Sequence, residues 1–475
     1  MNPIDLMDTY GPVVVGLGLA FFAVWGLVLA VRYVRADTDL RASMRQAVRV
    51  RRTWPRLAEM AGLCVVDRKP TLSAQIAREF STEQTRPIEP RTLTPTIKVR
   101  PDRFGVVVTA KCLPKVSLKE FQKAAEYLAD AWGCVRISVT PAKKPGQVVI
   151  RGVRHDPLAE MTTHVPTGEP PANITRMILG LDEYGVTAFL ALKEVSGVVG
   201  AGRPGTGKSS VINKAIADFS PSPLVQFAVV DGKAEAVGEG DYAEVADRLF
   251  RYVGDDVTAA NRFFREMVEL RRARVKAARG VFGTQDMWHK GPTAEWPIVV
   301  LIIDEAHTFF RDYKGSDRET KRLAALTAEN ARLVEDLVKK GRSAGIITFV
   351  ITQKATGDAI PTFIRDNCAV GFSFAQRTTE ASVAALGDNI REYPDMDPVE
   401  LQDPMFTGVL VMKAPNSKGF IRVRTPYVSA EHAAQVAAET AHLMRDPFQL
   451  LAALTGRRIT VRLDKPEPGT DGLAA

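Results

Sequence analysis

One short motif constrains the fold of this chain more than any other feature. It matches the pattern GxxxxGK[ST] at every fixed position, and it reads Gly202-Arg203-Pro204-Gly205-Thr206-Gly207-Lys208-Ser209. The motif follows the apolar run 195–200 and opens a helical stretch, 209–218. A strand, a glycine-rich turn and a helix in this order let backbone N–H groups and the helix N-terminus hold phosphates. We therefore predict a nucleoside triphosphate site made by these residues and Ser210.

Two side chains of the motif have predicted roles of their own. Lys208 is expected to reach the β- and γ-phosphates, and Ser209 is expected to ligate Mg²⁺. A weaker overlapping pattern, Gly200-x-Gly202-x-x-Gly205, is typical of dinucleotide folds. The pair Lys208-Ser209 favours the nucleoside triphosphate instead.

A second motif places two acids at the end of an apolar strand. The run 298–303 is entirely aliphatic and is followed by Asp304 and Glu305. Asp304 is placed to hold Mg²⁺ through water, which makes it a nucleotide-site and metal-site residue. Glu305 is the predicted general base that polarises the attacking water. Its presence favours hydrolysis over nucleotide binding alone.

Two further catalytic candidates flank the run 348–352. Gln353 follows this strand and could sense the γ-phosphate, although an ordinary polar strand end reads the same way. Arg342 ends the basic segment 339–342 and could act as an arginine finger on the nucleotide of a neighbouring subunit. The alternative for Arg342 is a solvated basic turn.

The apolar runs indicate an α/β fold class. Short runs that read as strands alternate with helical stretches, and they lie at 195–200, 225–230, 298–303, 348–352 and 369–374. Such runs are typical of a parallel sheet with helices on both faces. The arginine-rich stretch 271–279 reads as a solvated helix face. The basic stretch 311–322 could face phosphates in a channel or form a solvated loop.

The N-terminus predicts one transmembrane helix. Residues 9–31 carry no charge, and about 20 such residues cross a bilayer core. A cleavable signal peptide is disfavoured because the start is acidic and the apolar run is long. Arginines follow the run from Arg32 onward, which predicts a single-pass protein of the cell membrane, with its N-terminus outside and its motor domain cytoplasmic. These arginines could hold membrane lipid head groups or serve only as a topology signal.

The chain divides into five expected segments. They are an anchor at 1–35, a basic and Pro-rich connector at 36–98, a small α/β domain at 99–165, a motor domain at 172–445 and a tail at 446–475. The small domain reads as strand, helix, strand, strand. The net charge of +8 permits a nucleic-acid partner without requiring one. Four dispersed cysteines and six unclustered histidines predict neither a disulfide framework nor a zinc site.

Several segments resemble the FtsK/SpoIIIE family of DNA-pumping ATPases. They are 195–210, 341–346, 352–353 and 360–362, and Asp231-Gly232-Lys233 is similar to that family's Asp-Pro-Lys. The departure at Gly232 leaves the role of Lys233 open. The resemblance implies a RecA-like P-loop ATPase core, ATP as the nucleotide, a hexameric ring of this chain and double-stranded DNA drawn through the ring. It also implies the roles given above for Lys208, Glu305 and Gln353, with Arg342 acting in trans.

Within that family, the layout looks most like the conjugation-type, TraB-like proteins of actinobacterial plasmids and integrative elements. A single span is expected rather than several, and the stretch after Met444 is too short for a winged-helix DNA reader. The leading hypothesis is a membrane-anchored double-stranded DNA translocase for conjugative transfer, working with other conjugation proteins. The alternatives are an ATPase for protein export of the type VII or type IV coupling kind, a chromosome segregation translocase, and a nucleotide-gated scaffold with little turnover.

Overall fold

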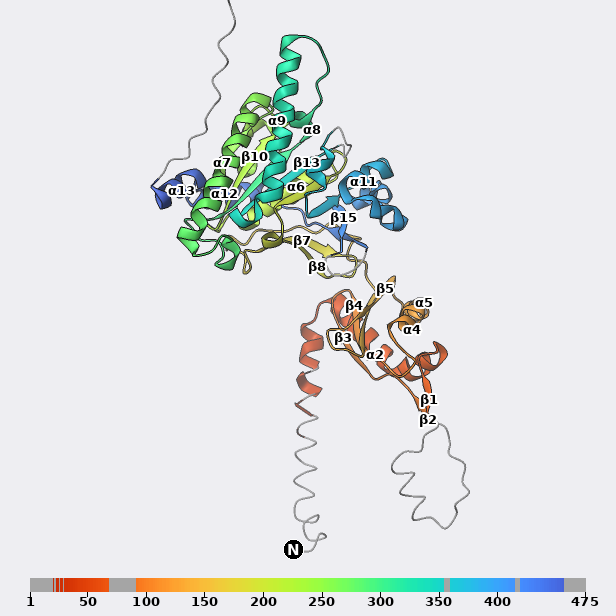
Figure 1. Cartoon of the computed structure of the whole chain (residues 1–475). Coiled ribbons are helices and arrows are strands. Elements are labelled where there is room, and N and C mark those ends of the chain that lie inside the picture. Colours follow the sequence, from red (N-terminus) through yellow and green to blue (C-terminus); the bar gives the residue numbers. More distant parts are fainter. Residues whose placement is uncertain are drawn as a thin grey trace, which may run out of the picture. The chain divides into compact units, whose positions relative to one another are not determined.

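The computed structural model describes residues 20, 23–24, 26–28, 30–67, 91–353, 359–414 and 419–456. The chain divides into two compact units, Met1–Pro157 and Leu158–Ala475 (Figure 1). No helix within the described ranges is both long and apolar enough to cross a membrane. The expected span at residues 9–31 lies largely outside the described residues.

The first unit is built on an antiparallel sheet with strand order β3-β4-β6-β5. Its strands are β3 (Ile97–Pro101), β4 (Gly105–Lys111), β5 (Arg136–Pro141) and β6 (Gln147–Val153). The helices are α2 (Thr38–Met60), α4 (Leu118–Lys123) and α5 (Ala125–Trp132), and β1 (Val65–Asp67) pairs with β2 (Arg91–Leu93). The strand, helix, strand, strand order predicted for this region is present, with its helix broken at Ala124.

Helix α2 belongs to the core of the first unit. Val50 and Trp54 are buried in one cluster with Val106 and Ile150 of the sheet. The Trp54 indole N–H donates to the Pro95 carbonyl over 2.6 Å. The segment 36–98, expected to be a connector, therefore supplies a core helix. The apolar residues recur at helical spacing on one face, while the arginines that suggested a solvated connector occupy the other.

The second unit contains a ten-stranded sheet in the order β11-β10-β12-β13-β9-β14-β15-β16-β7-β8. The strands are β7 (Arg176–Asp182), β8 (Thr187–Ala191), β9 (Gly197–Ala201), β10 (Val225–Asp231), β11 (Leu249–Val253), β12 (Ile298–Asp304), β13 (Ile346–Thr352), β14 (Val370–Ser373), β15 (Val409–Lys413) and β16 (Phe420–Arg424). From β11 to β14 all neighbours are parallel, which confirms the predicted parallel sheet for this part.

The other four strands, which were not among the predicted runs, are antiparallel, so the predicted parallel sheet is one part of a larger sheet. Only four residues join β7 to β8, and only six join β15 to β16. Connections this short return the chain beside itself, whereas a parallel pair needs a crossover of a dozen or more residues. The sheet is therefore mixed and mostly parallel.

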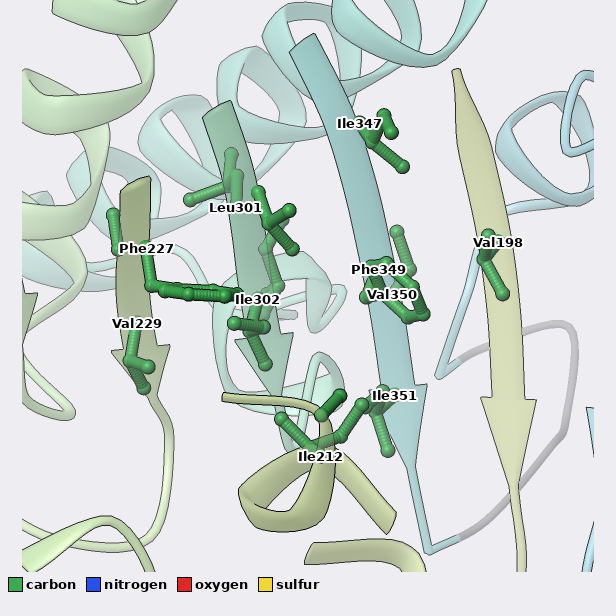
Figure 2. Packing of buried hydrophobic residues seen from close by; sticks show 14 of the residues in the cluster. Val198, Ile212, Phe227, Val229, Leu301, Ile302, Ile347, Phe349, Val350 and Ile351 are labelled. Atoms are coloured by element: carbon green, nitrogen blue, oxygen red, sulfur yellow. The ribbon is translucent and has the colours of Figure 1, made fainter. Parts of the chain in front are cut away.

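Helices cover both faces of the parallel part. They are α6 (Lys208–Phe219), α7 (Val257–Phe282), α8 (His307–Phe310), α9 (Arg318–Lys340), α10 (Thr362–Arg365), α11 (Thr379–Leu386), α12 (Ala430–Glu439) and α13 (Pro447–Thr455). Ile212 of α6 lines one apolar cavity with Phe349 of β13. Figure 2 shows both side chains in the core with those of the neighbouring strands. Gly197 instead faces Val338 of α9, so α6 and α9 lie on opposite faces.

The second unit extends beyond the predicted end of the motor domain at residue 445. Leu451 of α13 is buried in the main core. The buried Gln226 of β10 also holds the segment before α13, because its side-chain amide donates to the Leu443 carbonyl over 3.0 Å and its oxygen accepts from the Arg445 N–H over 2.9 Å. Part of the expected tail is thus core, and residues 457–475 lie outside the described residues.

Two arginines of α7 are buried, so the predicted solvated face is wrong for them. Arg274 is 1% exposed and donates to the carbonyls of Pro297 and Ala344 over 2.9 and 3.0 Å. Burial lowers its pKa to about 9. Arg271 pairs with Asp336 of α9 over 2.7 Å. These contacts tie α7 to α9 and to the ends of neighbouring strands.

Candidate nucleotide site

The phosphate loop and the two acids meet at one edge of the parallel sheet. The loop follows β9, Asp304 ends β12, and Gln353 follows β13, which lies between them in the sheet. Because parallel strands present their carboxyl ends at the same edge, the topology brings together three predicted features that are far apart in the sequence, from Gly202 to Gln353.

The phosphate loop is closed on itself by its own hydrogen bonds. The Arg203 carbonyl accepts from the Thr206 hydroxyl over 2.7 Å and from the Lys208 ammonium over 2.8 Å. The Arg203 N–H donates to the Ala375 carbonyl over 3.0 Å, which fixes the loop to the segment after β14. Gly207 has φ of +116°, and a Cβ there would lie 3.2 Å from the Gly408 Cα. A glycine is therefore required where the loop turns into α6.

Lys208 is buried in the site, and burial disfavours its protonated, charged form. Lys208 is only 5% exposed. Burial, together with the charge of the nearby Lys233, lowers the pKa of Lys208 to about 8. The carboxylates of Asp304 and Glu305 offset this only partly. An anionic ligand placed beside Lys208 would relieve the penalty, which suits a side chain that receives phosphates.

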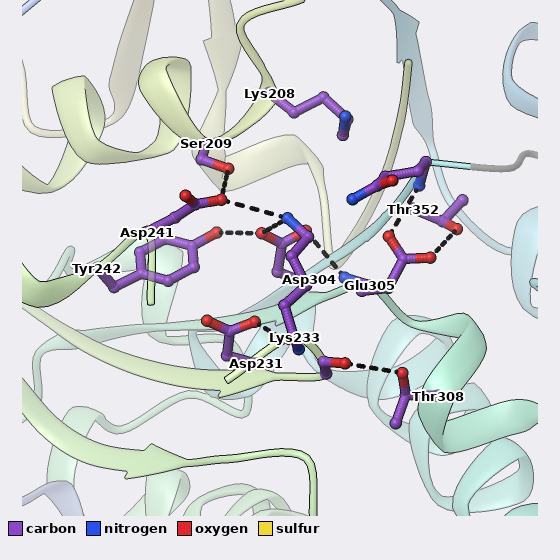
Figure 3. Close-up of polar contacts among 12 residues, drawn as sticks. Lys208, Ser209, Asp231, Lys233, Asp241, Tyr242, Asp304, Glu305, Thr308 and Thr352 are labelled. Carbon is purple, nitrogen blue, oxygen red and sulfur yellow. Dashed lines mark hydrogen bonds and ion pairs between the residues drawn. The ribbon is translucent and has the colours of Figure 1, made fainter. Parts of the chain in front are cut away.

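Asp304 is fully buried and holds two donors on one carboxylate oxygen. Its Oδ2 accepts from the Lys233 ammonium over 2.9 Å and from the Tyr242 hydroxyl over 3.0 Å (Figure 3). Burial alone would lower the pKa of Lys233, but the carboxylates of Asp304 and Asp241 outweigh it and the pKa is raised. Lys233 therefore stays charged and neutralises the acid at the end of β12.

Asp241 links the predicted metal ligand Ser209 to this cluster. The Ser209 hydroxyl donates to Asp241 Oδ2 over 2.6 Å, and the Lys233 ammonium lies 3.3 Å from the same oxygen. Burial by itself raises the pKa of Asp241, but Ser209 and Lys233 lower it by more than burial raises it. The pKa of Asp241 is therefore below its usual value. Sequence reasoning missed Asp241 and Tyr242, because they lie in a loop between β10 and β11 with no motif around them.

Glu305 is held in a strained backbone conformation beside β13. Its φ is +48°, in the left-handed region that costs a non-glycine residue about 1–2 kcal/mol. Its N–H donates to Asp304 Oδ1 over 2.8 Å, and its Oε2 accepts from the Gln353 N–H over 3.2 Å. The Thr352 hydroxyl lies 3.5 Å from Oε1. The carboxylate is thereby fixed at the strand end next to Gln353.

Gly232, which departs from the family's Asp-Pro-Lys, sits where two chain segments approach closely. Its N–H donates to the Asp304 carbonyl over 3.0 Å, a bond that proline could not make. A Cβ at Gly232 would lie 2.6 Å from the Thr308 hydroxyl and 2.8 Å from the Glu305 carbonyl oxygen. The next residue, Lys233, contacts Asp304, which is the structural role that the sequence left open.

A cavity of about 450 Å³ opens beside the phosphate loop. Its walls include Pro204, Gly205, the residues from Gly207 to Ser210, Lys233, Asp241 and Gln353. The volume lies in the range of small-molecule sites. Within the described parts of the chain, no three His, Cys, Asp or Glu residues cluster as a metal cage. Oxygen donors such as Ser209 and Asp304 fit Mg²⁺, which completes its shell with waters and substrate phosphates.

Arg342 lies at the opposite end of the sheet from these residues. It begins the short 3-10 helix η5 (Arg342–Ala344), just before β13, whereas Gln353 follows the other end of that strand. A seven-residue strand spans about 23 Å, so Arg342 does not reach the phosphate loop of its own subunit. Its guanidinium is half-exposed and lies 3.1 Å from Asp286. Any role at a nucleotide therefore requires a second subunit.

The sequence matches known proteins in both units. Residues 40–154 match a family described as the actinomycete conjugal transfer protein N-terminal domain. The chain is 23% identical over 313 residues to the DNA translocase FtsK of two Leptospira interrogans strains, and the match covers 62% of this chain and 30% of each relative. The chain thus spans about a third of the length of these curated relatives.

Solved structures with similar folds include two secretion or transfer proteins. The pCW3 conjugation coupling protein TcpA with ATPγS has a TM-score of 0.49 and 18% identity, covering 74% of this chain and 94% of that one. The cytoplasmic domain of the Thermomonospora curvata type VII secretion ATPase EccC has a TM-score of 0.46 and 18% identity, covering 60% and 33%. The sequence comparisons thus show a likeness to FtsK and, over residues 40–154, to the actinomycete conjugal transfer N-terminal domain.

Proposed function

We propose that this protein is a membrane-anchored ATPase that translocates double-stranded DNA during conjugative transfer. The observation that carries the proposal is the meeting of Lys208, Asp304 and Glu305 at the carboxyl edge of one parallel sheet. The FtsK relatives and the conjugal-transfer domain at 40–154 support DNA as the substrate and conjugation as the setting.

The hydrolytic chemistry follows from the positions of the side chains. Lys208 and the N–H groups at the start of α6 hold the β- and γ-phosphates. Mg²⁺, bound through Ser209 and Asp304, would neutralise charge on those phosphates. Glu305 would accept a proton from the attacking water. Gln353 lines the cavity beside the phosphate loop and would contact the γ-phosphate.

The proposed assembly is a ring of identical subunits, a homohexamer by resemblance to the family. Arg342 supports an assembly of this kind, because it lies about a strand length away from its own phosphate loop. A neighbour's Arg342 would stabilise charge that develops on the γ-phosphate.

The proposed membrane location rests on sequence and charge. Residues 9–31 are uncharged, and α2 carries a row of exposed arginines at 45, 49, 52 and 56. The spacing of these arginines places them on one helix face, opposite the buried face that holds Val50 and Trp54. Such a row close to an apolar segment suits anionic lipid head groups on the cytoplasmic side.

The proposal is tested by ATP hydrolysis of the full-length protein in lipid nanodiscs, with and without double-stranded DNA. Strong stimulation by DNA, lost in Glu305→Gln, is the expected result. Hydrolysis that Glu305→Gln abolishes but that DNA does not change would contradict the DNA substrate and direct attention to protein export. Absence of hydrolysis in the wild-type protein with DNA would contradict an ATP-driven motor.

A further inference from the structure

The cavity at the phosphate loop has an uncharged end that the phosphate chemistry does not use. Apart from the phosphate loop, the start of α6, Lys233, Asp241 and Gln353, its walls are formed by Met161, Thr407, Gly408, Thr425 and Tyr427. Met161 is 61% exposed and Tyr427 is 44% exposed. Two large, largely apolar side chains thus face solvent beside a highly charged site, an arrangement that neither core packing nor phosphate binding explains.

Hydrogen bonds fix this end directly to the phosphate loop. The Gly408 N–H donates to the Thr206 carbonyl over 3.0 Å, and the Thr425 N–H donates to the Gly408 carbonyl over 2.8 Å. The Thr425 hydroxyl donates to the same Gly408 carbonyl over 3.0 Å. Tyr427 follows two residues after Thr425. Its position relative to the loop is therefore set by backbone contacts rather than by its own side chain.

Tyr427 in turn holds the segment that carries Met161. The Tyr427 N–H donates to the Thr162 carbonyl over 2.8 Å, and the His164 N–H donates to the Tyr427 carbonyl over 2.7 Å. Thr163 and Tyr427 form a parallel β-bridge. These bonds use backbone atoms on both sides, so the ring of Tyr427 and the thioether of Met161 are left to contact a ligand in the cavity.

We propose that Met161 and Tyr427 form the subsite for the purine base of the nucleotide. This inference deepens the proposed function and rests on it, because it takes ATP as the ligand. The charged end of the cavity takes the phosphates, and the base then occupies the uncharged end. A flat aromatic base stacks on a tyrosine ring, and a polarisable thioether packs well against an aromatic face. The Thr425 hydroxyl already donates to Gly408 and is not needed by the base.

The experiment separates base binding from phosphate binding. Affinities for ATP and for inorganic tripolyphosphate, each with Mg²⁺, are measured by calorimetry on the full-length protein in nanodiscs. Tyr427→Ala is expected to weaken ATP about tenfold, since a base stacked on an aromatic ring is lost. Its affinity for tripolyphosphate is expected to change less than about twofold. Met161→Ala is expected to act in the same direction with a smaller effect.

Three controls keep the test decisive. Tyr427→Phe retains the ring and is expected to bind ATP within about twofold of wild type. Met405→Ala removes another exposed methionine, one that does not line the cavity, and is expected to change neither affinity. A thermal melt of each variant without nucleotide identifies loss of folding, which would lower the affinities for ATP and tripolyphosphate together. If Tyr427→Ala does not fold, the affinities of Tyr427→Phe and Met161→Ala test the subsite instead.

Two results would overturn the inference. One is an equal loss for ATP and tripolyphosphate in folded Tyr427→Ala, and the other is no loss for either ligand. Both leave the proposed ATPase intact, provided that Lys208→Ala abolishes the binding of both ligands. Failure of the wild-type protein to bind ATP or tripolyphosphate would instead overturn the ATP site itself, and the base subsite with it.

Discussion

The ammonium nitrogen of Lys233 lies 2.9 Å from Oδ2 of Asp304, so a lysine just beyond β10 neutralises the buried acid at the end of β12. Asp304 is 0% exposed, and a buried carboxylate without a cationic partner is strongly destabilising. Lys233 therefore compensates a buried charge in the second unit and fixes the acid at the end of β12. This contact also gives Lys233 a function that its motif alone did not specify.

Lys233→Met is expected to lower the free energy of unfolding by about 3 kcal/mol, because it leaves the Asp304 charge without this partner. Urea unfolding of the nucleotide-free protein measures the change. Lys193→Met, at an exposed lysine of the same unit, is the matched control and is expected to change stability by less than about 0.5 kcal/mol. Equal stabilities of the two variants would contradict the structural importance of the pair.

Gly232→Ala is expected to destabilise the protein by about 1–3 kcal/mol, because the new Cβ would press on the backbone oxygen of Glu305. It should also slow ATP hydrolysis, since Glu305 would move. Gly238→Ala is the control: no atom lies within 4 Å of a Cβ at that position, and stability should stay the same or rise by less than about 1 kcal/mol. Thermal melts and steady-state hydrolysis measure both effects, and indistinguishable variants would count against the close approach.

Nucleotide affinity is expected to fall as the pH rises above about 8. Burial lowers the pKa of Lys208 from 10.5 to about 8 in the free site, and only the protonated ammonium attracts phosphate. Above pH 8, Lys208 must take up a proton before the nucleotide binds. The affinity for nucleotide therefore falls by up to about tenfold per pH unit. The raised pKa of Lys233 keeps that lysine charged over the same range. Titration with a non-hydrolysable ATP analogue from pH 7 to 9.5 tests this, and a flat profile would contradict it.

The lowered pKa of Lys208 has the opposite effect on folding: it makes the free energy of unfolding rise with pH. The unfolded chain holds the Lys208 proton up to pH 10.5, whereas the folded chain releases it near pH 8. Between these values the unfolded state binds more protons, so the penalty for the buried charge is relieved and this lysine's contribution to stability improves with pH. Lys208→Met should remove that contribution to the pH dependence of unfolding measured without nucleotide.

Arg342→Ala is expected to reduce hydrolysis by about 10³-fold if the residue acts on a neighbour's nucleotide. Its half-exposed ion pair with Asp286 contributes little, so the melting temperature should hardly change. Mixing folded Arg342→Ala with folded Glu305→Gln should restore hydrolysis, because one variant supplies Glu305 and the other supplies the arginine. A mixture no more active than its components would exclude action in trans, and Lys339→Ala serves as the control for the loss of a basic charge nearby.

The sequence predicted the parts of the site that carry fixed spacing. The phosphate loop and the strand ending in Asp304 and Glu305 each have a local pattern, and the alternation of strands and helices places their ends together. Asp241 and Tyr242 have no such pattern, because their role depends on how one loop folds over β10 and β12. Charge was misleading in α2, because its arginines lie on one exposed face while the opposite face packs in the core. It was misleading at Arg274, because a buried arginine can donate to carbonyls inside a core.

Met161 and Tyr427, proposed above as the base subsite, lie where the chain enters the second unit. Residues 158–164 are the first residues of the second unit. They are held there by the Leu158 carbonyl, which accepts from the Arg424 guanidinium over 2.6 Å, and by the bridge between Thr163 and Tyr427. The two units have no other covalent connection. A pull on the backbone at Leu158 would therefore reach Arg424 and Tyr427, and Tyr427 lines the cavity beside the phosphate loop.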